Sequence, residues 1–256
     1  MSLIEALTLG LLQGLTEFIP VSSSGHLLLA HELFGTSENT LSFDVALHVG
    51  TLLALLVYFR NDLWTLLKNI NQKNEQGRLA RLLLLATIPA AAVGLLFGDF
   101  IDEQLRSASV VALSLAAVGV LMLIVDRNVN KLDASEVSKK QAVSVGFAQI
   151  LALIPGVSRS GITITAGIFM GLSRKQAARF SFLLAVPIIA GSALGILLKD
   201  GGELSVNTEL ILGMTTAFIS GLLAIKFLLG VIGKVGLKPF AYYRIALAGI
   251  VLLFLV

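Results

Sequence analysis

Pro20-Val-Ser-Ser-Ser-Gly25 and Pro155-Gly-Val-Ser-Arg-Ser-Gly161 are two short polar turns that share V-S-x-S-G, with corresponding residues 136 positions apart. Each interrupts a long apolar stretch, the first at about 4–33 and the second at about 142–172, and these stretches have ten identities in thirty positions. Paired, interrupted apolar segments are typical of inverted-repeat membrane proteins, where they form an intramembrane site. We therefore predict two repeats, at about 1–125 and 140–256, within a single integral membrane domain over 1–256.

The composition agrees with a membrane protein. Of the 256 residues, 56% are apolar and only 14% are charged, whereas soluble domains carry about 25% charged residues. Six further stretches approach the roughly 20 residues that a helix needs to cross a bilayer; they are 44–60, 80–98, 108–125, 180–198, 210–230 and 241–256. We expect an all-α polytopic protein with six transmembrane helices and two re-entrant broken-helix hairpins. The absence of cysteine excludes disulfides, thiolate metal sites and cysteine nucleophiles.

The Lys and Arg residues predict an orientation, if both broken segments return to the side from which they enter. The loops around 60–81, 126–140, 174–179 and 226–244 then share one side and hold sixteen basic residues, against two, Arg106 and Lys199, on the other side. The basic side is expected to be cytoplasmic. The net charge of +3 therefore indicates membrane topology, and we predict no nucleic-acid partner. The first hairpin enters from outside and the second from inside, so their tips are expected to meet near the midplane.

The first turn carries groups suited to binding an anion. Glu17 follows Gln13 by four residues, which places both on one helix face just before the turn. Serines at a restarting helix cap its N-terminus, and its free N–H groups form a cradle for phosphate or carboxylate. Glycine lets the backbone approach the ligand. We predict that the following residues line the cradle in the two turns: Ser22, Ser23, Ser24, Gly25, Ser158, Ser160 and Gly161.

Two ionisable residues beside the turns are further functional candidates. Arg159 takes the place of the middle serine in the second turn and is the only basic residue assigned to the membrane interior. Its guanidinium suits bidentate phosphate binding; alternatively, it only neutralises Glu17 as a structural pair. His26 adjoins the serine turn and could exchange protons near neutral pH. We expect His31 and His48 to be structural.

At these residues the chain resembles the undecaprenyl pyrophosphate phosphatase family, also called the bacitracin-resistance protein family. The first motif is Gln13-Gly-Leu-Thr-Glu17, followed by the serine turn and His26, and the second is the whole stretch from Pro155 to Gly161; Ser181-Phe-Leu-Leu-Ala-Val-Pro187 also matches. The family removes one phosphate from undecaprenyl pyrophosphate at the outer face of the bacterial plasma membrane. This reaction recycles the lipid carrier for peptidoglycan and other wall polymers and confers bacitracin resistance.

The resemblance implies a catalytic set of Glu17, Ser23, His26 and Arg159. It also implies a divalent cation, Mg²⁺ or Ca²⁺, held by Glu17 and Gln13, and adds Gly156 and Gln13 to the residues that bind substrate. Two routes stay open: Ser23 attacks with His26 or Glu17 as base, or water attacks and Ser23 only binds phosphate. The partners implied are the polyprenyl pyrophosphate and the membrane lipids, and the sequence leaves a homodimer open. The rival class is a lipid flippase or a secondary transporter of an anionic substrate, since broken helices in inverted repeats are equally typical of transporters.

Overall fold

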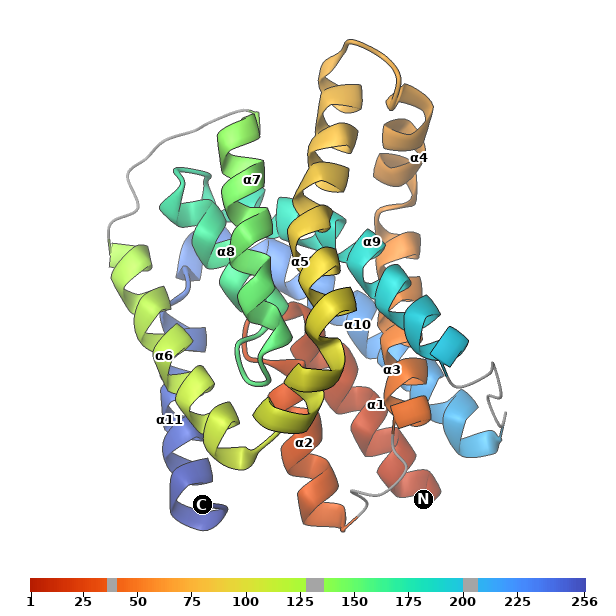
Figure 1. Ribbon diagram of the computed structural model, residues 1–256, viewed down its shortest axis with the longest axis vertical. Helices are drawn as coiled ribbons and strands as arrows, with labels where there is room; N and C mark the ends of the chain where they lie inside the picture. Colours follow the sequence, from red (N-terminus) through yellow and green to blue (C-terminus); the bar gives the residue numbers. More distant parts are fainter. Residues whose placement is uncertain (36–40, 128–135, 200–206) are drawn as a thin grey trace.

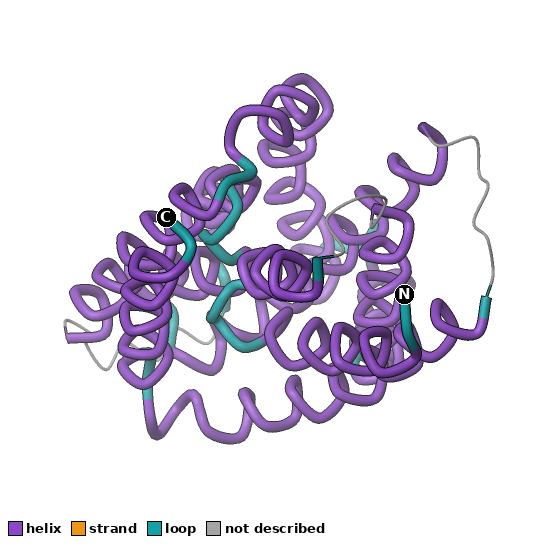
Figure 2. The backbone as a smooth tube through the Cα atoms, turned by 90° about the horizontal axis from the view of Figure 1, so that it is seen from below, coloured by secondary structure: helices purple, strands orange, loops and turns teal. Residues whose placement is uncertain are grey.

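The computed structural model describes residues 1–35, 41–127, 136–199 and 207–256, and this part of the chain is helical with no strand (Figures 1 and 2). The helices in chain order are α1 Leu3–Phe18, α2 Ser23–Phe34, α3 Leu41–Tyr58, α4 Arg60–Asn69, α5 Glu75–Leu105, α6 Ala108–Arg127, α7 Lys139–Ala148, the 3₁₀ helix η1 Gln149–Leu153, α8 Arg159–Phe169, α9 Arg174–Lys199, α10 Thr208–Val235 and α11 Lys238–Phe254. Figure 2 shows both termini on one face of the bundle, well separated.

Each predicted span coincides with one helix, namely α3, α5, α6, α9, α10 and α11. Four of these, α5, α6, α9 and α10, are long and apolar enough to cross a membrane. A fifth span results only if α3 and α4 count together, although they meet at a bend of 76°. Helix α11 has only 17 residues. The chain is therefore a multi-pass helical membrane protein, while the number of six spans stays a prediction. The short helix α4 was not predicted.

The two interrupted stretches form helical hairpins. In Figure 1, α1 runs from the lower end of the molecule to its middle and α2 returns to the lower end, whereas α7 enters from the upper end and α8 returns to it. The tips touch, because the Ser160 hydroxyl donates to the Ile19 carbonyl at 3.4 Å. The hairpins thus enter from opposite ends, as an inverted repeat requires.

Helices of one half pack on helices of the other half, and corresponding pairs make corresponding contacts. Helix α1 packs on α10 and α7 packs on α5, while α3 packs on α10 and α9 packs on α5; α6 packs on α11. Glycines at corresponding positions permit the close approach. A Cβ on Gly10 would lie 2.4 Å from the Gly213 carbonyl oxygen, and one on Gly146 would lie 2.6 Å from that of Ala86. Small residues at helix contacts are characteristic of membrane bundles.

The distribution of side chains suits a bilayer. Large apolar residues such as Leu95, Leu96 and Phe254 are exposed on the outside of the helices. A few charged and amide side chains lie inside, among them Gln13, Glu17 and Arg244, which are all buried. An apolar exterior around a polar centre places the ionisable groups where they contact protein instead of lipid.

Candidate active site

The two V-S-x-S-G turns have the same backbone and hydrogen bonds. Ser22 has φ 78° and Ser158 has φ 72°, and they are the only non-glycine residues with positive φ in the described ranges. Each serine caps the helix that follows, since Ser22 Oγ accepts from the Gly25 N–H at 3.3 Å and Ser158 Oγ accepts from the Gly161 N–H at 3.1 Å. Such backbone strain costs about 1–3 kcal/mol per residue and clusters at functional sites.

The turns start α2 and α8, whose N-termini lie on either side of Glu17. Two groups donate to its buried carboxylate at short range: Arg159 Nη2 to Oε1 at 2.6 Å and Ser23 Oγ to Oε2 at 2.6 Å. Gln13 Nε2 also donates to Oε2, at 3.2 Å. The structure therefore brings together Gln13, Glu17 and Ser23 from the first hairpin and Arg159 from the second, residues that are up to 146 positions apart in the sequence.

His26 lies beside this cluster and faces a different partner. Its Nδ1 donates to the Ser22 carbonyl at 2.6 Å, so in the neutral ring Nε2 accepts, and Tyr243 Oη lies 2.7 Å from it. The two rings are stacked at 5.7 Å with an interplanar angle of 4°. Among the described residues no hydrogen bond joins His26 to Ser23. The base in contact with Ser23 is Glu17.

The remaining predicted binding residues fall into two groups. Ser22, Ser158 and Ser160 are buried, and their hydroxyls make hydrogen bonds within and between the turns. The buried glycines are Gly25, Gly156 and Gly161. A Cβ on Gly156, which has φ 90°, would lie 2.6 Å from the Val111 carbonyl oxygen. These residues shape the turns, whereas Ser24 is exposed beside the partly exposed Ser23 and Arg159.

Two buried polar atoms in the cluster have no hydrogen-bond partner among the residues that the structure describes. They are Arg159 Nη1, a donor, and Gln13 Oε1, an acceptor. A buried polar group without a hydrogen bond is costly, so each atom is available to bind a group from outside the chain. The guanidinium N–H suits a phosphate oxygen. The amide oxygen beside the Glu17 carboxylate suits a hard cation, which takes oxygen ligands.

Two side chains at the site were missed or misassigned from the sequence. Arg244 was counted in a cytoplasmic loop, but it is fully buried in α11 against both turns. Tyr243 was not singled out. His48 Nε2 lies 3.9 Å from Glu17 Oε2, and His31 pairs with Asp44 at 2.9 Å. That both histidines are structural stays a prediction. The available signal for Arg244 was a basic residue six positions after the start of a short apolar helix, α11.

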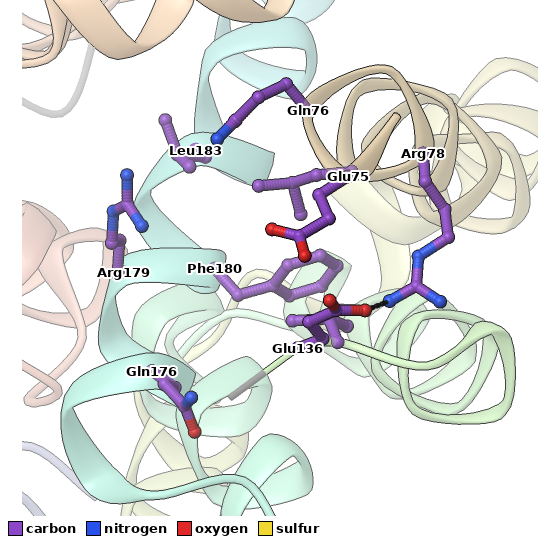
Figure 3. Close-up of a pocket in the computed structure, with 10 residues that line it drawn as sticks. Glu75, Gln76, Arg78, Glu136, Gln176, Arg179, Phe180 and Leu183 are labelled. Atoms are coloured by element: carbon purple, nitrogen blue, oxygen red, sulfur yellow. Dashed lines mark hydrogen bonds and ion pairs between the residues drawn. The ribbon is translucent and has the colours of Figure 1, made fainter. Parts of the chain in front are cut away.

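A separate pocket lies at the N-terminal ends of α5 and α9 (Figure 3). It encloses about 200 Å³, and Glu136 within it pairs with Arg78. Apolar residues such as Phe180 and Leu183 also line it. None of the predicted site residues lines this pocket. It belongs to the end of the bundle that the charge count assigns to the cytoplasm.

The fold and the site together define a multi-pass helical membrane protein with a buried polar centre. The family model described as "Bacitracin resistance protein BacA" matches residues 6–250, and the chain belongs to this family. It is 47% identical to the undecaprenyl-diphosphatase of Aliivibrio salmonicida over 96% of both chains. It is 44% identical to that of Hahella chejuensis over 100% of this chain and 99% of the relative. The identity to the Caldicellulosiruptor bescii protein of the same name is also 44%, over 99% and 98%.

Proposed function

We propose that this chain hydrolyses undecaprenyl pyrophosphate to undecaprenyl phosphate and inorganic phosphate. The reaction recycles the lipid carrier of cell-wall synthesis, and bacitracin resistance follows from it. The family and the names of the relatives support hydrolysis over transport. The single observation that carries the proposal is Arg159 Nη1. It is buried without a partner in the described ranges, and it lies where two helix N-termini and the Glu17 carboxylate meet. A diphosphate on a lipid suits such a site inside a membrane protein.

The cluster accommodates both routes of phosphoryl transfer. In the first, Ser23 Oγ attacks the terminal phosphorus and gives its proton to Glu17 Oε2, with which it already shares a hydrogen bond at 2.6 Å. Undecaprenyl phosphate leaves as the P–O bond to the bridging oxygen breaks, and water then hydrolyses the phosphoserine. In the second, Glu17 activates water directly and Ser23 binds a phosphate oxygen. Arg159 stabilises charge on the transferring group in either case.

Purified protein in detergent tests the proposal. Wild-type protein should release one phosphate from each undecaprenyl pyrophosphate, and Glu17→Gln purified in parallel should release almost none. The matched variant controls for contaminating phosphatases. Equal release by both samples would assign the activity to a contaminant and contradict the proposal.

A divalent cation, Mg²⁺ or Ca²⁺, is part of the proposal. Gln13 Oε1 and Glu17 would hold it, and the diphosphate and water would complete its shell, as is usual for Mg²⁺. The described residues contain no group of three His, Cys, Asp or Glu side chains that could hold a metal ion. When bound, the cation neutralises phosphoryl oxygens.

The cation is tested by chelation. Excess chelator should abolish phosphate release, and added Mg²⁺ or Ca²⁺ should restore it. Gln13→Ala should need more cation for half-maximal rate, because one of the two protein ligands is gone. Full activity in chelator would remove the cation from the proposal and leave Glu17 as a base.

The finer membrane arrangement is also a proposal. It comprises six spans and two re-entrant hairpins, in repeats at about 1–125 and 140–256, within the bacterial plasma membrane. Substrate would reach the site from the outer face, because the first hairpin enters from that side. The opposite entry of the two hairpins in Figure 1 supports this arrangement. A homodimer stays a hypothesis, which the mass of the purified protein in detergent would test.

A further inference from the structure

Arg244 contacts both broken turns at once. Its Nη2 donates to the carbonyls of Gly156 at 2.8 Å and Val157 at 3.0 Å, in the second turn. Its Nη1 reaches the Pro20 carbonyl of the first turn at 3.5 Å. Nη2 and Nε also reach the carbonyls of Ser114 and Leu115 in α6, each at 3.3 Å. A single side chain from α11 thus joins α6 and the two turns.

The chemistry of these acceptors explains why the residue is an arginine. Where a helix is broken, backbone carbonyls lose their helical donors, and in a membrane interior no lipid can replace them. Arginine presents five N–H donors in a rigid plane, whereas lysine presents three donors at one point. All five acceptors of Arg244 are carbonyl oxygens, and the described residues place no carboxylate in an ion pair with it.

The catalytic candidates lie directly after the residues that Arg244 holds. Val157 is two positions before Arg159, and Pro20 is three positions before Ser23. The neighbouring Tyr243 lies 2.7 Å from His26 Nε2. The separation of the two turns sets the distance from Glu17 to Arg159, because Glu17 is in the first hairpin and Arg159 begins the second.

We infer that Arg244 is the positioning residue of the active site, which holds the two broken turns at the separation that phosphoryl transfer requires. The inference rests on the proposed function. Arg244 itself touches no reacting atom. Because its contacts to both turns would be lost, its removal should misplace Arg159 relative to Glu17 and Ser23. A displacement of about 1 Å from a change outside the chemistry can cost about 10²-fold in rate.

Kinetics test the inference with Arg244→Lys and Arg244→Met. Both should lower kcat by about 10²-fold with KM nearly unchanged, since geometry and not ground-state binding is lost. The matched control is Arg174→Met, which removes a different arginine, one that is partly buried and paired with Asp126 at 2.8 Å. It should lower the melting temperature and leave kcat unchanged. Full kcat in Arg244→Lys, or a loss in Arg174→Met equal to that in the Arg244 variants, would overturn the inference.

A distance measurement tests it without activity. The chain has no cysteine, so spin labels can be placed at Leu33→Cys on α2 and Phe169→Cys on α8, both at exposed positions. The wild-type background should give one narrow distance distribution, and Arg244→Lys should broaden or shift it while Arg174→Met does not. An unchanged distribution in Arg244→Lys would contradict the inference. Failure of wild-type protein to release phosphate would instead reject the proposed function, which the distance measurement does not depend on.

Discussion

Arg159 uses only half of its guanidinium within the protein. Nη2 donates to Glu17 Oε1 at 2.6 Å, and the buried Nη1 has no partner in the described part of the chain. If the free half of the guanidinium binds phosphate, the shape of the side chain matters as well as its charge. A lysine ammonium is a point charge, and it cannot donate to a Glu17 oxygen and a phosphate oxygen in one plane. We expect Arg159→Lys and Arg159→Ala both to lower the rate of phosphate release by about 10²–10³-fold, in protein that remains monodisperse.

The opposing hypothesis is that Arg159 only neutralises Glu17. Removing one partner of a buried pair costs about 3–5 kcal/mol, and an apolar replacement of both is often neutral. Melting temperature and phosphate release, measured on Arg159→Ala, Glu17→Leu and the double variant, separate the two hypotheses. A stable, inactive Arg159→Ala supports phosphate binding, and an active double variant contradicts it.

Ser23 differs from its neighbours because its hydroxyl donates to the candidate base. The hydrogen bond to Glu17 Oε2 at 2.6 Å places proton donor and acceptor in contact. If Ser23 is the nucleophile, Ser23→Ala should be nearly inactive, and rapid quench of wild-type protein with substrate labelled in the terminal phosphate should trap labelled protein. A loss of only a few-fold in Ser23→Ala, with no labelled protein, would favour direct attack by water.

At the scale of the elements, each broken turn combines a helix cap with a strained backbone. Alanine at Ser22 or Ser158 removes the cap and keeps the strain of a positive φ; glycine removes the cap but relieves that strain. We expect each alanine variant to lower the free energy of unfolding by about 0.5–2 kcal/mol and each glycine variant to cost less. Denaturant unfolding in detergent measures both.

Ser138 provides the matched control for the turns. It caps α7 with an ordinary φ of −79°, and its Oγ accepts from the Gln141 N–H at 3.3 Å. The difference between alanine and glycine should therefore be smaller at Ser138 than at Ser22 and Ser158. Equal differences at all three positions would mean that the positive φ carries no strain.

The same turns show how far the sequence could predict the structure. The repeated V-S-x-S-G located both breaks, and the serines that match at the offset of 136 have the same backbone conformation and caps. The contact between Glu17 and Arg159 followed from the meeting of the two tips. Arg244 was misassigned, because hydropathy places a basic residue near a helix end in a loop. Its buried position depends on backbone carbonyls of two turns that are far apart in the sequence, and hydropathy along the chain does not report such tertiary contacts.

At the scale of the whole molecule, corresponding helices of the two halves make corresponding contacts across the bundle. This correspondence supports the inverted repeat more directly than sequence identity does. Helices α1 and α10 pair as α7 and α5 do, and α6 packs on α11. The predicted span at 44–60 ends close to Tyr58, where α3 ends, but the bend of 76° that leads into the separate helix α4 was not predicted. The predicted loops near 126–140 and 199–209 lie partly outside the described residues.

The orientation in the membrane is predicted from the distribution of basic residues, and it decides from which side the first hairpin enters. Because Arg244 is buried, the predicted cytoplasmic side holds fifteen basic residues instead of sixteen, against two on the other side. An excess of that size still assigns the basic side to the cytoplasm. Gln72, between α4 and α5, and Gln104, near the other end of α5, are both exposed. Because the chain has no cysteine, single cysteines at these positions report on opposite faces.

An impermeant thiol reagent added to intact spheroplasts should label Gln104→Cys and should label Gln72→Cys only after permeabilisation. Helix α5 is one of the four helices that are long and apolar enough to cross the membrane, so its two ends must differ in access if it does cross. The opposite pattern would place the basic end outside and would make the first hairpin, with Glu17 and Ser23, enter from the cytoplasm. The substrate would then have to reach the site from the inner leaflet, contrary to the proposed outer-face reaction. Labelling of both positions in intact spheroplasts would show that α5 does not span, and the six-span arrangement would fail with it.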